Sequence, residues 1–68
     1  MSFVIVFDFP KVLTSERRKL NRMLHRMGAE RVQDSFWRCD DLKALFEAAR
    51  FIKSCGGRVE ILEEKFVF

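Results

Sequence analysis

The chain has 68 residues with a formal net charge of +3, and 49% of its residues are apolar. This length allows one domain, residues 1–68, that is marginally stable as a monomer, because so short a chain buries only about 60% of its unfolded surface. The longest apolar run has five residues, whereas a membrane span needs roughly 20, and no basic leader of a signal peptide precedes it. Cys39 and Cys55 are too few for a disulfide framework. We therefore expect a cytoplasmic protein with no membrane partner.

Residues 3–8 predict a central strand. Five consecutive apolar residues begin it, so both of its faces are apolar, as in a strand that is covered on both sides. Alternation assigns Phe3, Ile5 and Phe7 to one face, and Val4, Val6 and Asp8 to the other. Pro10 cannot continue a ladder of hydrogen bonds, so Asp8 lies at the end of the strand, where a scaffold can present a reactive group.

A first helix is predicted after the connection 9–13. Thr14 or Ser15 is the expected N-cap, and Gly28 is the expected C-terminal stop. Apolar residues recur at helical spacing and predict the buried face: Leu20, Met23, Leu24 and Met27.

Residues 30–38 predict strand, which Asp34-Ser35 bends or divides into two short strands. Asp40 or Asp41 is the expected cap of a second helix that ends at Gly56-Gly57. We expect its buried face to consist of Leu42, Leu45, Phe46, Ala49 and Ile52, widened by Ala44, Ala48, Phe51 and Cys55. Residues 58–62 alternate as a strand, and residues 65–68 predict a short final strand.

The predicted order of elements, β-α-β-β-α-β with an extra C-terminal strand, is that of the ferredoxin-like α+β fold. This fold has an antiparallel sheet with both helices on one face. Two helices leave the other face of the sheet open, although the first strand is apolar on both sides. We therefore expect a homodimer in which the open faces of two copies pack around a two-fold axis.

Positive charge is concentrated in residues 11–31, which hold seven Lys or Arg residues against two Glu. Arg18, Arg22 and Arg26 are four residues apart and predict a basic helix face that suits the phosphates of a nucleic acid. The residues that flank this face or extend it are Arg17, Lys19, His25, Arg31, Arg38 and Arg58. A solvated helix surface is the alternative interpretation.

Asp8 is the main candidate for chemistry. A carboxylate at a strand end suits Mg²⁺ or another divalent cation, which takes one or two protein carboxylates together with water and phosphate. Two copies of Asp8 at the axis of a dimer would make a shared site. The structural alternative, which the sequence favours, is that Asp8 caps the turn into Phe9-Pro10.

The aromatic residues Phe36 and Trp37 have two interpretations. They could stack on bases, as aromatic sheet faces do in RNA-binding proteins. Packing in the core or in a dimer interface is the favoured one, because large aromatic residues dominate such surfaces. No Ser-His-Asp arrangement or zinc ligand set is evident, since His25 is the single histidine.

Four motifs, in this order along the chain, resemble the small CRISPR-associated spacer-acquisition family Cas-two. They are Val4-Ile5-Val6-Phe7-Asp8, Arg17-x-Lys19-Leu20, Gly28, and Val32-Gln33-x-Ser35-Phe36. The resemblance covers nearly the whole chain.

The resemblance implies a ferredoxin-like homodimer that acts in antiviral defence beside the Cas-one integrase and holds a DNA fragment. It also implies a metal-dependent endonuclease on RNA or DNA, with Asp8 as the metal-binding residue and with Arg17, Ser35 and Phe36 at other motif positions. The final strand of one copy would pair with the sheet of the other.

Three other functions remain open at this point. The same dimer could be a non-enzymatic DNA-binding scaffold that docks an integrase by strand addition. It could be a toxin-type ribonuclease of similar fold outside CRISPR. It could also be a ferredoxin-like regulatory or small-ligand module that binds no nucleic acid.

Overall fold

The computed structural model of the protein describes residues 2–65. The elements in chain order are β1 (Phe3–Asp8), α1 (Thr14–Arg26), β2 (Glu30–Gln33), β3 (Phe36–Cys39), α2 (Leu42–Ser54) and β4 (Arg58–Glu63). In this described part, neither helix has the length or the apolar character that crossing a membrane requires. The predicted division of residues 30–38 into two strands is confirmed, with the turn at Asp34-Ser35.

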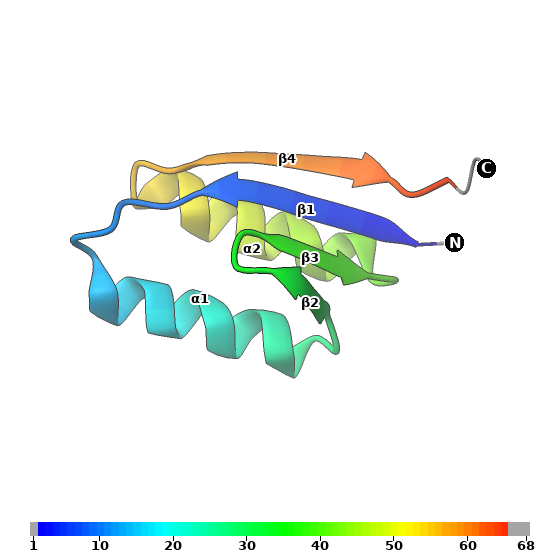
Figure 1. The fold of residues 1–68 in the computed structure, drawn as a ribbon, viewed down its shortest axis with the longest axis horizontal. Coiled ribbons are helices and arrows are strands. Elements are labelled where there is room, and N and C mark those ends of the chain that lie inside the picture. The colour runs from blue at the N-terminus through cyan, green and yellow to red at the C-terminus, as the bar shows by residue number, and fades with distance from the viewer. Residues whose placement is uncertain (1, 66–68) are drawn as a thin grey trace.

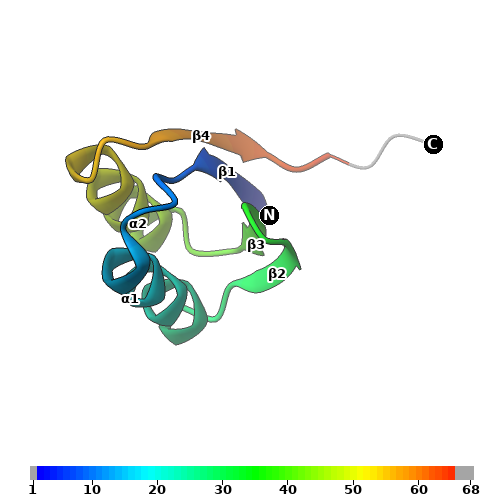
Figure 2. The ribbon, with the colours of Figure 1, turned by 60° about the vertical axis from the view of Figure 1, so that its left-hand side comes forward.

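The four strands form one sheet in the order β2-β3-β1-β4, and each neighbouring pair is antiparallel. Both helices cover the same face of this sheet (Figure 1), and Figure 2 shows the helices and the sheet as two layers. The predicted ferredoxin-like fold and the central position of β1 are therefore confirmed. Of the predicted final strand, Lys65 lies outside any strand, and residues 66–68 lie outside the described residues.

The core lies between the sheet and the helices. β1 contributes Ile5 and Phe7, while Val4 and Asp8 lie on its other face, as the alternation predicts. Trp37 is only 1% exposed and packs in this core, so the packing interpretation of Trp37 is confirmed. The largest fully buried side chains are Trp37, Ile5, Leu20, Leu24, Leu45 and Ile52.

The helix ends explain how the chain turns back onto the sheet. Asp41 caps α2 by accepting a hydrogen bond from the Ala44 amide at 3.0 Å. Both helices end in a Schellman motif with a glycine at positive φ, Gly28 at 80° and Gly56 at 85°. The N-cap predicted for α1 is wrong, because the helix already includes Thr14, and the residue before it, Leu13, makes no side-chain capping bond.

The prediction that Phe46 belongs to the buried face of α2 is wrong. Phe46 of α2 is 51% exposed, whereas its neighbour Leu45 is fully buried. Along α2 the buried positions are Leu45, Ala48 and Ile52, which follow one helical stripe. Phe46 lies beside this stripe, on the side of β4. Because β4 is the last strand of the sheet, no further strand in the described chain covers Phe46.

Candidate nucleic-acid interface

The basic face of α1 is exposed as predicted. Arg18, Arg22 and Arg26 are all solvent-exposed, and each lies about one helical turn from the next. Within residues 2–65, none of them forms an ion pair with a carboxylate. The three guanidinium groups are thus available to an anionic partner from solvent.

The residues that flank this face differ in their surroundings. The Lys19 ammonium lies 5.3 Å from the centroid of the Phe51 ring on α2, a cation–π contact. The His25 and Trp37 rings are nearly perpendicular to each other, with 5.1 Å between their centroids. Arg17 is half-buried near the start of α1. Lys19 and His25 therefore contact neighbouring elements, and the exposed arginines form the centre of the basic face.

Most arginines outside α1 form ion pairs with carboxylates of the protein. Arg31 pairs with Asp34, Arg50 pairs with Glu47, and Arg38 pairs with both Glu30 and Glu64. Arg31 and Arg38 thus have carboxylate partners within the described chain, and their extension of the basic face stays a prediction. Arg58 differs, since it is exposed and forms no ion pair within the described chain.

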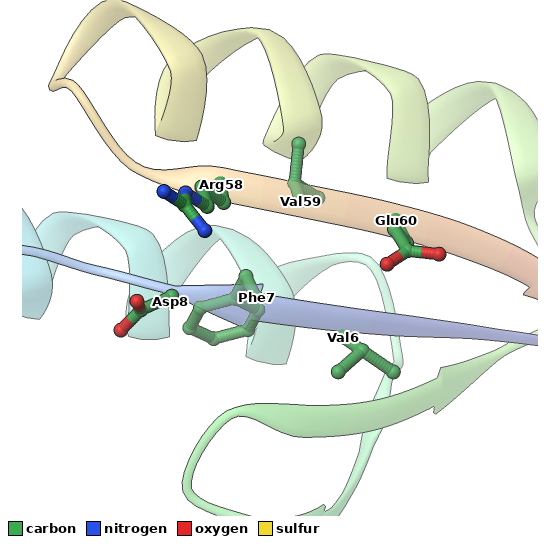
Figure 3. A pocket seen from close by; sticks show the side chains of 6 residues that line it. All are labelled: Val6, Phe7, Asp8, Arg58, Val59 and Glu60. Carbon is green, nitrogen blue, oxygen red and sulfur yellow. The ribbon is translucent and has the colours of Figure 1, made fainter.

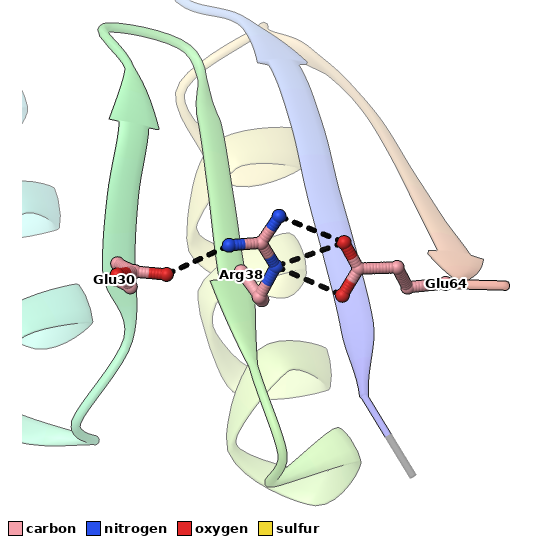
Figure 4. A network of polar contacts seen from close by, with 3 residues as sticks. All are labelled: Glu30, Arg38 and Glu64. Atoms are coloured by element: carbon pink, nitrogen blue, oxygen red, sulfur yellow. Dashed lines mark hydrogen bonds and ion pairs between the residues drawn. The ribbon is translucent and has the colours of Figure 1, made fainter. Parts of the chain in front are cut away.

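Arg38 forms the centre of a polar network on the sheet face that the helices leave open (Figure 4). Its Nε donates to both carboxylate oxygens of Glu64 at 2.8 and 2.9 Å, and its Nη1 donates to Glu30 at 2.7 Å. These bonds from Arg38 lower the pKa of the Glu64 carboxyl. Sequence reasoning missed this network, because Glu30 stands opposite Arg38 only through a register shift between Arg31 and Gln33 in the β2–β3 hairpin.

The rest of the open sheet face is partly apolar. Val4 is only 7% exposed, and it stands opposite Arg38 on β3 and Leu62 on β4. Val6 and Phe36 face each other on β1 and β3 and are half-buried, and Leu62 of β4 is 49% exposed. The open face thus combines a polar network at one end with half-buried apolar side chains on β1 and β3 and an exposed Leu62 on the edge strand β4.

Asp8 lies at the end of β1 and is exposed to solvent. Among residues 2–65 its carboxylate accepts no hydrogen bond and joins no ion pair. The turn-capping interpretation is therefore wrong for the described chain. Asp8 lines a shallow hollow of about 470 Å³ together with Val6, Phe7, Arg58, Val59 and Glu60 (Figure 3).

The fold brings several predicted motif positions to this end of β1. The Phe7 amide donates to the Ser35 carbonyl at 3.0 Å, and Phe36 lies opposite Val6. Arg17 belongs to the first turns of α1, which begin at the same end of the molecule as β1 finishes (Figure 1). In contrast, Arg22 and Arg26 follow α1 toward the opposite end.

Asp8 is the exposed carboxylate that one copy of the described chain presents at the end of β1. Asp8 supplies a single carboxylate, and no group of three His, Cys, Asp or Glu side chains that could hold an ion comes together within residues 2–65. Arg58 stands opposite Asp8 on β4, and its positive charge opposes a cation there. We therefore derive no reaction step that passes through a metal ion.

Comparison of the chain with protein-family models and with curated protein sequences finds no match.

Proposed function

We propose that this protein binds nucleic acid through phosphate contacts made by the exposed face of α1. The observation that supports this proposal is the row of Arg18, Arg22 and Arg26, which are exposed and unpaired within the described chain, whereas Arg31, Arg38 and Arg50 are neutralised. Like charges four residues apart cost a helix about 0.2–0.5 kcal/mol per pair. This row therefore opposes folding, and a bound anion would offset the repulsion.

The geometry of the row suits a phosphate backbone. Arg18 and Arg26 are eight residues apart, which corresponds to about 12 Å along the helix axis. Duplex DNA presents one phosphate per roughly 1.7 Å of its own axis when both strands are counted. Three arginines on one helix face can thus each reach a phosphate, and contacts of this kind carry no direct sequence information.

We further propose that the protein acts as a two-fold homodimer. The proposal is supported by the open sheet face, where Leu62 is 49% exposed on β4, and Val6 and Phe36 on β1 and β3 are half-buried. Packing two such faces together would remove this apolar surface from water and would give one assembly two basic helices.

The biological setting that we propose is spacer acquisition in antiviral defence, as a DNA-holding scaffold beside an integrase partner. This part of the proposal depends on the sequence resemblance to the Cas-two family. The scaffold is the preferred form of that function, because Arg58 stands opposite Asp8 and its positive charge opposes a cation there. A toxin-type ribonuclease is the alternative setting for the same surface.

A second candidate activity is metal-dependent hydrolysis of RNA or DNA at Asp8. It is favoured by the exposed carboxylate of Asp8, which lacks a partner within residues 2–65. A dimer would have to complete the site with the Asp8 of the second copy. Asp8→Asn should then abolish Mg²⁺-dependent cleavage and leave the protein folded. If the parent protein does not cleave RNA or DNA with Mg²⁺ or Mn²⁺, hydrolysis at Asp8 is excluded. The proposal that α1 binds nucleic acid is independent of that result.

Fluorescence anisotropy with a labelled DNA duplex of arbitrary sequence tests the binding proposal. We expect the double variant Arg18→Glu/Arg22→Glu to lower affinity about tenfold or more at moderate salt, because each reversal removes a phosphate contact and adds repulsion. The matched control is Lys43→Glu/Arg50→Glu, which makes the same change in net charge on the exposed surface of α2. Equal effects of the two double variants would contradict the proposal.

A further inference from the structure

Asp8 and Arg58 are directly opposed residues on neighbouring strands. They are partners in the antiparallel register of β1 and β4, so their side chains emerge on the same face of the sheet. Both line the hollow of about 470 Å³, and both line a second, smaller hollow of about 160 Å³ at the chain turn beside Pro10 and Gly56. Figure 3 shows the two charged groups on adjacent strands without a link between them.

The backbone of Arg58 is fixed by the glycine that precedes it. The Gly57 amide donates to the Ile52 carbonyl at 2.9 Å and closes the end of α2. A Cβ atom at Gly57 would lie only 2.6 Å from the Asp8 carbonyl oxygen and 2.7 Å from Cγ2 of Ile52. Glycine therefore lets β4 start in close contact with the end of β1, which places an exposed cation beside Asp8 at a defined position.

Arg58 also lies at the same end of the molecule as the start of the basic helix. β1 finishes there, β4 begins there, and α1 begins after the short connection 9–13 (Figure 1). This connection and the first turns of α1 carry the exposed cations Lys11 and Arg18. Exposed cations of α1 and of β4 thus lie at the same end of the molecule, with Arg58 on the sheet face that α1 does not cover (Figure 1).

We propose that Arg58 is a phosphate-binding residue that extends the nucleic-acid surface from α1 to the junction of β1 and β4. This inference rests on the proposed function, and its ligand is a phosphodiester of the same polynucleotide. A guanidinium group suits this task because its donors match phosphate oxygens in a bidentate geometry. Asp8 then acts as a negative neighbour that weakens phosphate binding when no divalent cation is present.

The competing explanation is that Arg58 and Asp8 are a cross-strand ion pair that stabilises the sheet. In that case, Arg58→Gln and Asp8→Asn should both lower the unfolding temperature, and neither should change the binding of nucleic acid. The two explanations also predict different effects of Asp8→Asn on duplex affinity. A phosphate site at Arg58 gains affinity when the neighbouring carboxylate is neutralised, whereas a purely structural ion pair leaves the affinity unchanged.

The test is duplex binding by anisotropy in a chelator-containing buffer, measured over a range of salt concentrations. We expect Arg58→Gln to weaken binding about threefold to tenfold and to reduce the slope of log Kd against log salt by about 0.9, the value of one phosphate contact. Arg58→Lys should retain most of that slope, and Asp8→Asn should bind more tightly than the parent protein. Arg50→Gln is the matched control, because Arg50 is exposed on α2 and paired with Glu47.

If Arg58→Gln behaves like Arg50→Gln while the α1 double variant loses affinity, the inference at Arg58 is overturned and the proposed function stands. If the parent protein does not bind the duplex, both are overturned. Unfolding temperatures of all variants, measured in parallel, show whether any loss of binding comes from loss of the fold.

Discussion

Arg38 on β3 and Glu64 after β4 join across the intervening strand β1, with three donor–acceptor distances of 2.8–2.9 Å. Val4, the register partner of Arg38 on β1, is only 7% exposed, although both helices cover the other face of the sheet (Figure 1). The backbone amide of Glu64 also donates to the Ser2 carbonyl at 2.9 Å. These contacts hold the chain beyond β4 against the start of β1.

The bridge predicts a loss of stability in acid. Hydrogen bonds from Arg38 lower the pKa of Glu64 below its ordinary value of 4.5. A carboxyl whose pKa is lowered by folding stabilises the folded state above its unfolded pKa, and this contribution is lost as the pH falls through the folded pKa. We expect the unfolding temperature of the parent protein to exceed that of Glu64→Gln near neutral pH, and the difference to shrink below about pH 4.5. A difference that does not change with pH would contradict this assignment.

Neighbouring positions on α2 should differ sharply in their contribution to stability. Leu45 is fully buried and Phe46 is 51% exposed. Leu45→Ala should cost about 2–5 kcal/mol in urea unfolding, whereas Phe46→Ala should cost about 1 kcal/mol or less. Ile52→Val, at about 0.5–1.5 kcal/mol, provides a measurable core variant if Leu45→Ala does not fold. A cost at Phe46 as large as that at Leu45 would show that the side chain is covered in solution.

Alanine substitutions at Gly57 and Gly28 should both lower stability, but only the one at Gly57 should weaken duplex binding. Gly57→Ala must displace backbone, because the added Cβ meets the Asp8 carbonyl oxygen, and overpacking of this kind costs about 1–3 kcal/mol. Gly28→Ala meets nothing within 4 Å but is strained by its φ of 80°, at about 1–2 kcal/mol. Both variants should unfold more easily by calorimetry. Weaker duplex binding is expected for Gly57→Ala alone, since it moves Arg58, and equal binding by the two variants would contradict that link.

The fold could be predicted from local patterns in the sequence. Alternation in residues 3–8, helical spacing of apolar residues and glycines after each helix were enough to give the order of elements and the central strand. Each of these patterns lies within a few residues of the helix or strand that it predicts. The N-cap of α1 was a local prediction that failed, and two other failures concern relations that the sequence does not express locally. The exposure of Phe46 follows from the position of β4 at the sheet edge, and the Arg38–Glu64 bridge joins residues 26 positions apart.

The candidate site was predictable only in part, for the same reason. Asp8 and the row on α1 are visible because the sequence itself places a carboxylate at a strand end and arginines at helical spacing. The sequence offered Arg31, Arg38 and Arg58 as equal extensions of the basic face. The structure shows that Arg31 and Arg38 have carboxylate partners, and the pairing of β1 with β4 shows that Arg58 stands opposite Asp8.

The salt dependence of duplex binding tests most directly whether α1 is a phosphate-binding surface. The measurement compares the slope of log Kd against log salt, between about 50 and 200 mM, for the parent protein and for Arg18→Gln/Arg22→Gln/Arg26→Gln. We expect a steep slope for the parent protein and a reduction by nearly 3 in the triple variant, about 0.9 for each phosphate contact removed. A slope near zero, or one that the triple variant leaves unchanged, would contradict the proposal that these arginines bind nucleic acid.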